Sequence, residues 1–249
     1  MTRQFADHFS RLAECYGKHR PSYPSELFQV VAEAAPSRER AWDAGTGSGQ
    51  AAVRLAEYFD EVVATDASAA QIAKSWPHPG VIYRVEPAEE TTLPDGSVDL
   101  ATSGQAAHWF QIDAFYAEVG RVLKPDGVVA LWCYGLESVD DDVNYVIEKL
   151  YVEMLGSFWP KRTLPDHTYQ DIPFPFAELP RRVFRMHMDW TLDQLLNGFR
   201  TWSASARYQE INGVDPLDVL DEEFREAWGD PERVRRVSWP VYLRYGRRG

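Results

Sequence analysis

The segment Asp43-Ala44-Gly45-Thr46-Gly47-Ser48-Gly49-Gln50 constrains the fold of this chain more than any other. Its three glycines in five residues let the backbone turn sharply and come close to a ligand. Residues 41–43 read as the end of a strand, and apolar side chains in residues 50–59 have mostly helical spacing. Amides at the start of such a helix would point into the space that the turn encloses. The segment therefore predicts a strand, a ligand-binding turn and a helix, and a glycine-rich turn without a ligand is the alternative.

Strand-like and helix-like patterns alternate through the first half of the chain, which is typical of parallel βαβ units. The expected helices lie near residues 25–35, 50–59, 68–76 and 112–123, and the expected strands at 41–43, 61–66, 81–85, 98–102 and 128–132. The second half differs, because prolines between residues 160 and 180 exclude a long helix there. Alternating apolar residues predict further strands at 183–190 and 237–245, and helices are expected at 140–154, 192–203 and 217–228.

Acidic residues beside the glycine turn narrow the class of ligand. Gly47, Gly49 and Ala52 fit a dinucleotide-binding fingerprint, and Asp66 lies 17 residues after Gly49, near the spacing at which a carboxylate reaches ribose hydroxyls. No Gly-Lys-Ser/Thr follows, which excludes a Walker-type phosphate loop. Asp43 would repel the pyrophosphate of NAD and attract a ligand that carries an ammonium and a sulfonium, as S-adenosylmethionine does.

The chain resembles the class I S-adenosylmethionine-dependent methyltransferases in several motifs. In that family an acidic residue ends the first strand before the glycine turn, as Asp43 does, and an acidic residue ends the second strand, as Asp66 does. Ala88-Glu89 stands before Leu93-Pro94-Asp95-Gly96, where many members contact adenine. The run from Arg121 to Gly127 is similar to the methyltransferase type 11 group. Two more segments, residues 16–24 and 105–110, resemble the trans-aconitate methyltransferase-like branch.

The resemblance implies an α/β fold, the Rossmann-like class I methyltransferase fold. Its mostly parallel sheet has seven strands with an antiparallel last strand, helices on both faces, and a helical and irregular region that covers the substrate. We expect one structural domain with four parts: an N-terminal lid at 1–35, a cofactor-binding core at 36–135, variable covering helices at 136–236 with a sixth strand near 183–190, and a last strand at 237–249.

The resemblance also implies which residues contact S-adenosylmethionine. The expected contacts are Asp43, Ala44, Gly45, Thr46, Gly47, Gly49, Asp66, Ala67, Ala88, Glu89, Gln105, Tyr16 and Arg20. His108 follows the fourth strand, whose carboxyl end faces the cofactor crevice, and is the candidate general base. It could equally orient its loop by hydrogen bonds.

The favoured acceptor is a small carboxylic acid, methylated on oxygen by direct in-line transfer, because an ionised carboxylate needs no general base. The arginines that could receive it are Arg181, Arg182, Arg185, Arg200 and Arg207. A phenol, amine or carbon acceptor is the alternative. A cofactor-binding protein without turnover and a nicotinamide-dependent oxidoreductase are alternatives of other classes.

Composition limits the partners and the compartment. The 249 residues carry 26 Lys and Arg against 38 Asp and Glu, a net charge of -12, which argues against nucleic acid as a partner. No segment has the length and apolarity of a membrane span, and residues 1–16 do not resemble a signal peptide, so a cytoplasmic protein is expected. The two cysteines and the scattered histidines have no metal-ligand spacing, so no metal is expected.

Overall fold

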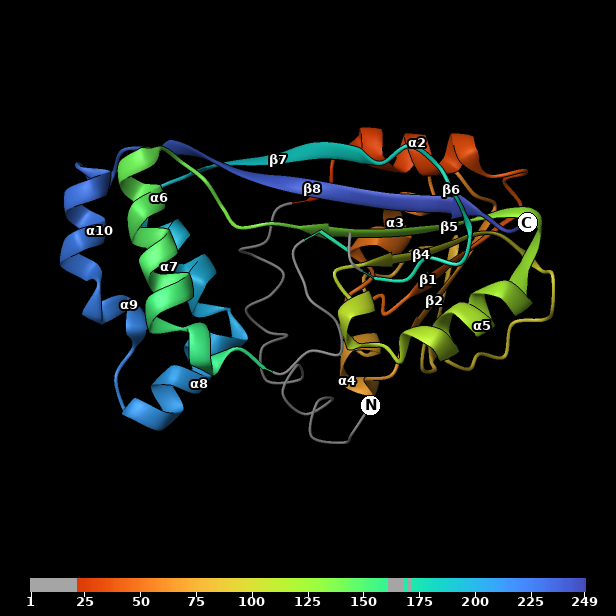
Figure 1. The fold of residues 1–249 in the computed structure, drawn as a ribbon, viewed down its shortest axis with the longest axis horizontal. Helices are drawn as coiled ribbons and strands as arrows, with labels where there is room; N and C mark the ends of the chain where they lie inside the picture. Colours follow the sequence, from red (N-terminus) through yellow and green to blue (C-terminus); the bar gives the residue numbers. More distant parts are fainter. Residues whose placement is uncertain (1–21, 161–167, 170–171) are drawn as a thin grey trace.

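The computed structural model describes residues 22–160, 168–169 and 172–249, which form one mixed β-sheet and its covering helices (Figure 1). The hydrogen-bonded strand order is β3-β2-β1-β4-β5-β8-β6, and β7 also pairs with β8. The strands are β1 Arg40–Ala44, β2 Glu61–Asp66, β3 Val81–Val85, β4 Val98–Gly104, β5 Leu123–Tyr134, β6 Ala177–Glu178, β7 Arg182–Trp190 and β8 Arg235–Arg247.

Strands β1 to β5 are parallel, and β8 runs antiparallel to β5 from the Val128–Arg247 pair to the Tyr134–Val241 pair. The expected mostly parallel sheet with an antiparallel last strand is therefore confirmed. Strands β6 and β7 both pair with the other edge of β8, and the amide of Leu179 between them donates to the Tyr245 carbonyl. The outermost strand is thus divided in two, which brings the number of hydrogen-bonded pieces to eight.

Helices cover both faces of the parallel strands, as expected. They are α2 Ser25–Ala34, α3 Gln50–Leu55, α4 Ala69–Ile72 and α5 Ile112–Val122. Neighbouring residues of β5 point to opposite faces, so Val128 packs in the cluster that contains Phe28 and Leu55, and Val129 packs with Phe115 of α5. Helices α3 and α4 end several residues before the positions expected from the sequence.

The second half adds a helical cap beyond one end of the long β7–β8 pair (Figure 1). Its helices are α6 Asp141–Glu148, the π-helical η2 Lys149–Met154, the short η3 Gly156–Phe158, α7 Leu192–Arg200, α8 Ser203–Asn212, α9 Pro216–Val219 and α10 Asp221–Trp228. Asp140 accepts a hydrogen bond from the Val143 amide and so caps the start of α6. Trp190 and Trp239, with ring centroids 5.1 Å apart, belong to the same core cluster as the cap residue Phe224. The cap and the sheet therefore share one hydrophobic core, and no helix in the described ranges is long and apolar enough to cross a membrane.

Candidate active site

The turn after β1 has a left-handed backbone at each of its glycines. Gly45, Gly47 and Gly49 have φ values of 68°, 58° and 87°. A Cβ on Gly45 would lie 2.6 Å from the Cβ of Ala106, and one on Gly49 would collide with the hydroxyl of Tyr83. A Cβ on Gly47 would meet no atom of the described residues within 4 Å. Two of the glycines are therefore required by close packing, and the third faces open space.

Asp43 is buried at the mouth of this turn, with 1% of its surface exposed. Its two carboxylate oxygens accept hydrogen bonds from the hydroxyls of Thr46, at 2.6 Å, and Thr102, at 2.8 Å. Burial is the main reason why the pKa of Asp43 is raised to about 6; the hydrogen bonds from Thr46 and Thr102 oppose the rise, and the negative charge of Asp66 adds a smaller increase. A cation beside Asp43 would therefore stabilise its ionised form.

Asp66, at the end of β2, holds the turn in place. One oxygen accepts from the Gly47 amide at 3.0 Å and the other from the Ser68 amide at 2.8 Å. Burial raises the pKa of this carboxyl despite both hydrogen bonds. The amide of Thr46 donates to the Thr65 carbonyl, so amides of the turn bond within the protein. A turn with occupied amides and two carboxylates does not suit a pyrophosphate, whereas it suits a cationic, hydroxyl-bearing ligand.

Tyr83 of β3 contacts the glycine turn, although no local sequence pattern points to it. Its hydroxyl donates to the Trp76 carbonyl at 2.7 Å and lies where a Gly49 side chain would stand. Burial, followed by the negative charge of Asp43, raises the pKa of Tyr83 to about 12. Its contact with the turn depends on the parallel pairing of β2 and β3, which no local pattern encodes.

Three further predicted residues lie around the same end of the sheet. Ala67 is half-buried directly after β2, and Ala88 is buried in the loop after β3. The Glu89 carboxylate accepts from the Gln111 amide at 2.9 Å, at the start of α5. Glu89 is thus held by α5, with a second oxygen and further lone pairs available for another donor.

The segment after β4 carries Gln105 and His108. Gln105 has a φ of 54°, and its side-chain amide donates to the Tyr134 carbonyl at 3.4 Å. His108, only 5% exposed, lies in the short helix η1 Ala107–Trp109, and its Nδ1 is 3.0 Å from the hydroxyl of Tyr169. The close approach of Gly45 to Ala106 places this segment directly beside the glycine turn.

The structure does not bring the other predicted residues that it describes to the glycine turn. Tyr16 and Arg20 lie outside the described residues. Arg181 pairs with Glu178, and Arg200 pairs with Asp215 at 2.7 Å, so both arginines are engaged elsewhere. Arg182, Arg185 and Arg207 are exposed. Among the described residues, none of these five arginines contacts the glycine turn through a hydrogen bond or ion pair. No group of three metal-ligating side chains gathers in the part of the chain that the structure describes.

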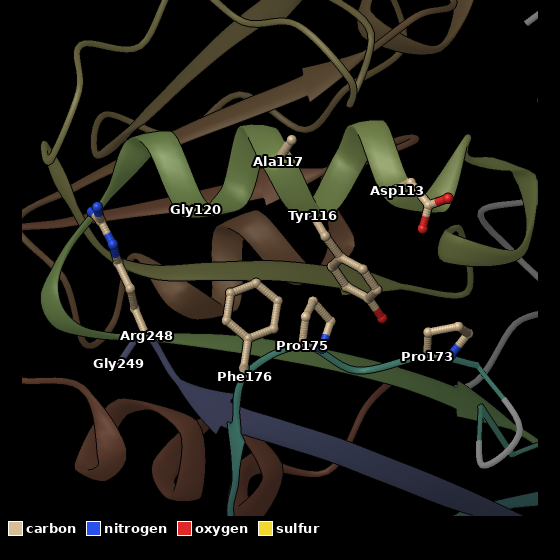
Figure 2. A pocket seen from close by; sticks show the side chains of 9 residues that line it. All are labelled: Asp113, Tyr116, Ala117, Gly120, Pro173, Pro175, Phe176, Arg248 and Gly249. Carbon is tan, nitrogen blue, oxygen red and sulfur yellow. The ribbon is translucent and has the colours of Figure 1, made fainter.

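A separate pocket of about 580 Å³ lies between α5 and the segment that leads into β6 (Figure 2). It is lined by Asp113, Tyr116, Ala117, Gly120, Pro173, Pro175, Phe176, Arg248 and Gly249. Burial raises the pKa of Tyr116, whose hydroxyl points between Pro173 and Pro175 and has no partner among the described residues (Figure 2). Because no predicted site residue lines this pocket, it is distinct from the candidate active site.

Comparisons with known proteins bear on the class of protein. The matching family model is that of a methyltransferase domain, over residues 42–131. A relative from Dictyostelium discoideum, provisionally named a methyltransferase, is 34% identical over 96% of this chain and 94% of its own length. A solved structure from Anaeromyxobacter dehalogenans, provisionally described as a type II methyltransferase, is 44% identical with a TM-score of 0.86, over 92% of this chain and 97% of that one. A provisionally named S-adenosylmethionine-dependent methyltransferase of Saccharomyces cerevisiae is 28% identical over 48% of this chain and 44% of its own length.

The sheet order, the glycine turn and the carboxylates that end β1 and β2 define a Rossmann-like enzyme that binds S-adenosylmethionine. The chain belongs to the methyltransferase domain family of type 11. It is an S-adenosylmethionine-dependent methyltransferase, which confirms the expected class of enzyme and its cofactor. The nicotinamide-dependent and non-catalytic alternatives are thereby set aside.

Proposed function

We propose that the enzyme methylates a carboxylate oxygen of a small acceptor, with the cofactor held between the glycine turn and the end of β4. When bound, S-adenosylmethionine supplies a methyl group on a sulfonium that is already reactive toward a well-placed nucleophile. The protein then has to orient the acceptor in line with that methyl and to exclude water.

Asp66 and Asp43 have the geometry to hold the cofactor. Each oxygen of Asp66 accepts one backbone hydrogen bond, from the Gly47 or the Ser68 amide, and has a further lone pair for a ribose hydroxyl. Asp43 supplies a negative charge for the ammonium of the methionine part. Gly47 allows close approach of a ligand, because no described residue occupies the place of its missing side chain. Gln105 is proposed to contact the methionine part, and Ala67, Ala88 and Glu89 the nucleoside; Tyr16 and Arg20 remain proposals from the sequence.

The environment of His108 carries the proposal of a carboxylate acceptor. The ring is almost fully buried, and its Nδ1 is paired with the Tyr169 hydroxyl, as in a histidine that fixes a loop. A carboxylate acceptor is already ionised at neutral pH and needs no general base. Its methylation is therefore compatible with a histidine that is engaged in fixing a loop. The narrower resemblance of residues 16–24 and 105–110 to trans-aconitate methyltransferase-like proteins supports the same acceptor class.

A phenol or amine acceptor is the second candidate, favoured by the position of His108 directly after β4. In that reaction His108 would take the proton of the acceptor. General-base catalysis contributes roughly 100- to 10,000-fold to a rate, so the two candidates differ strongly in their dependence on His108.

A methyl-transfer assay separates the two candidates. Labelled S-adenosylmethionine is offered with panels of small carboxylic acids, phenols and amines, and the best acceptor is then tested with His108→Ala and the milder Tyr169→Phe. The proposal predicts transfer to a carboxylic acid and a kcat of His108→Ala within about tenfold of wild type at saturating acceptor. Transfer to phenols or amines alone, with a loss of 100-fold or more in His108→Ala, would replace it with the second candidate.

A further inference from the structure

Three buried side chains in the described residues have a polar atom without a hydrogen-bond partner. They are Ser103, through its hydroxyl, Tyr116, through its phenol, and Trp132, through its indole N–H. Such an atom is unfavourable in a folded protein and requires an explanation. Tyr116 lines the separate pocket of Figure 2. Of the three residues, Trp132 alone lies on the same face of the sheet as Asp43.

The strand register places Trp132 on that face. Asp43 pairs with Thr102, and Gly104 pairs with Trp132. Because side chains alternate along a strand, Thr102 and Gly104 share one face and Ser103 points to the other. Asp43 and Trp132 therefore project from the same face of neighbouring strands, at the carboxyl ends that border the glycine turn.

The indole edge of Trp132 lies over the backbone of Gly104. A Cβ on Gly104 would stand 2.6 Å from Trp132 Nε1. Tyr23 and Phe28 pack edge-on against the same indole, with ring centroids 5.7 Å and 6.0 Å away. The N–H edge of the indole therefore lies over Gly104. Gly104 is about 7 Å, or two residues, along β4 from Thr102, and Thr102 is one strand spacing of about 5 Å from the backbone of Asp43.

We infer that the indole N–H of Trp132 binds the carboxylate of the cofactor's methionine part, an assignment that rests on the proposed cofactor site. An α-amino acid carries an ammonium and a carboxylate on one carbon. Asp43 offers a negative acceptor for the first group, and Trp132 offers a donor for the second on the same face of the sheet. Gly104 has no side chain, and this lets the indole N–H edge of Trp132 lie close to its backbone. Binding of the cofactor satisfies the unpaired donor of Trp132.

The test compares two ligands that differ in the amino acid part. S-adenosylhomocysteine carries it, and 5′-methylthioadenosine lacks it while retaining the nucleoside and sulfur. Dissociation constants for both are measured by calorimetry with wild type and with Trp132→Phe, which keeps an aromatic ring and removes the N–H. A hydrogen bond to a charged group predicts a loss of about 10- to 100-fold for S-adenosylhomocysteine and no change for 5′-methylthioadenosine.

Trp228→Phe is the matched control, because Trp228 is also buried, lies in the cap, and already donates its N–H to the Arg233 carbonyl at 3.0 Å. Its ratio of the two constants should equal that of wild type. An unchanged ratio in Trp132→Phe, including an equal loss for both ligands, would overturn the inference. Failure of wild type to bind S-adenosylhomocysteine would instead contradict the proposed cofactor site itself.

Discussion

The buried carboxylate of Asp43 links the stability of the fold to pH. With 1% exposure, its carboxyl is shielded from water, and its pKa of about 6 lies well above the ordinary value of 3.8. Between these two pH values the folded protein binds more protons at this site than the unfolded chain does. Stability from Asp43 is therefore present at low pH and is lost as the pH rises through about 6.

We predict that Asp43→Asn removes this pH dependence. The pKa shift corresponds to about 3 kcal/mol, so the free energy of unfolding of wild type should fall by up to that amount, relative to Asp43→Asn, between pH 4 and pH 7. Urea denaturation across this range measures the difference. Parallel pH profiles for the two proteins would contradict the assignment of a raised pKa to Asp43.

At the same scale, local sequence predicted some of the residues that surround the glycine turn and missed others. Asp43 and Asp66 were predictable because the glycine turn makes strong conformational demands that few other segments share. Tyr83 and Trp132 were not, because their contacts with Gly49 and Gly104 arise from strand pairing between distant segments. The positive φ of Gln105 was not predictable either, because glutamine does not favour the left-handed backbone conformation.

At the scale of the element, the glycine turn has positions with different requirements. Gly49 has a φ of 87°, and the Tyr83 hydroxyl lies where its side chain would stand. Gly47 has a φ of 58°, and no described residue lies close to the place of its side chain. A non-glycine residue in the left-handed region costs about 1 to 2 kcal/mol. Overpacking adds about 1 to 3 kcal/mol where there is no room.

Gly49→Ala is accordingly expected to destabilise the protein by about 1 to 3 kcal/mol more than Gly47→Ala, as measured by urea unfolding at pH 7. Tyr83→Phe in the Gly49→Ala background should recover part of the difference, because it removes the nearest atom. Equal losses for the two alanine variants would show that Tyr83 does not restrict the turn.

The elements of the first half were more predictable than those of the second. Five parallel strands and their helices follow from strand-like and helix-like segments that alternate along the chain, and the methyltransferase fold confirms the expected architecture. The cap is harder to predict, because its short helices are held by contacts between separate segments, such as those of Phe199 in α7 with Trp202 and with Phe224 in α10. The division of the edge strand into β6 and β7 likewise depends on pairing with β8.

At the scale of the whole molecule, the net charge of -12 opposes the approach of an anionic acceptor. Salt screens this repulsion, with a Debye length of about 30 Å at 0.01 M and about 8 Å at 0.15 M. We predict that kcat/KM for a carboxylate acceptor rises severalfold between these salt concentrations. The neutral amide of the same acid, measured as a competitive inhibitor, should bind equally at both. A fall in kcat/KM with salt would instead indicate local cations that attract the acceptor.

We propose that the glycine turn and its two carboxylates select a nucleoside that carries an amino acid ammonium group over a dinucleotide. Titration of the protein with S-adenosylhomocysteine and with NAD, followed by calorimetry, tests this most directly. The arrangement of Asp43 and Asp66 around the turn predicts saturable one-to-one binding of S-adenosylhomocysteine and no heat with NAD. Saturable binding of NAD without binding of S-adenosylhomocysteine would contradict it.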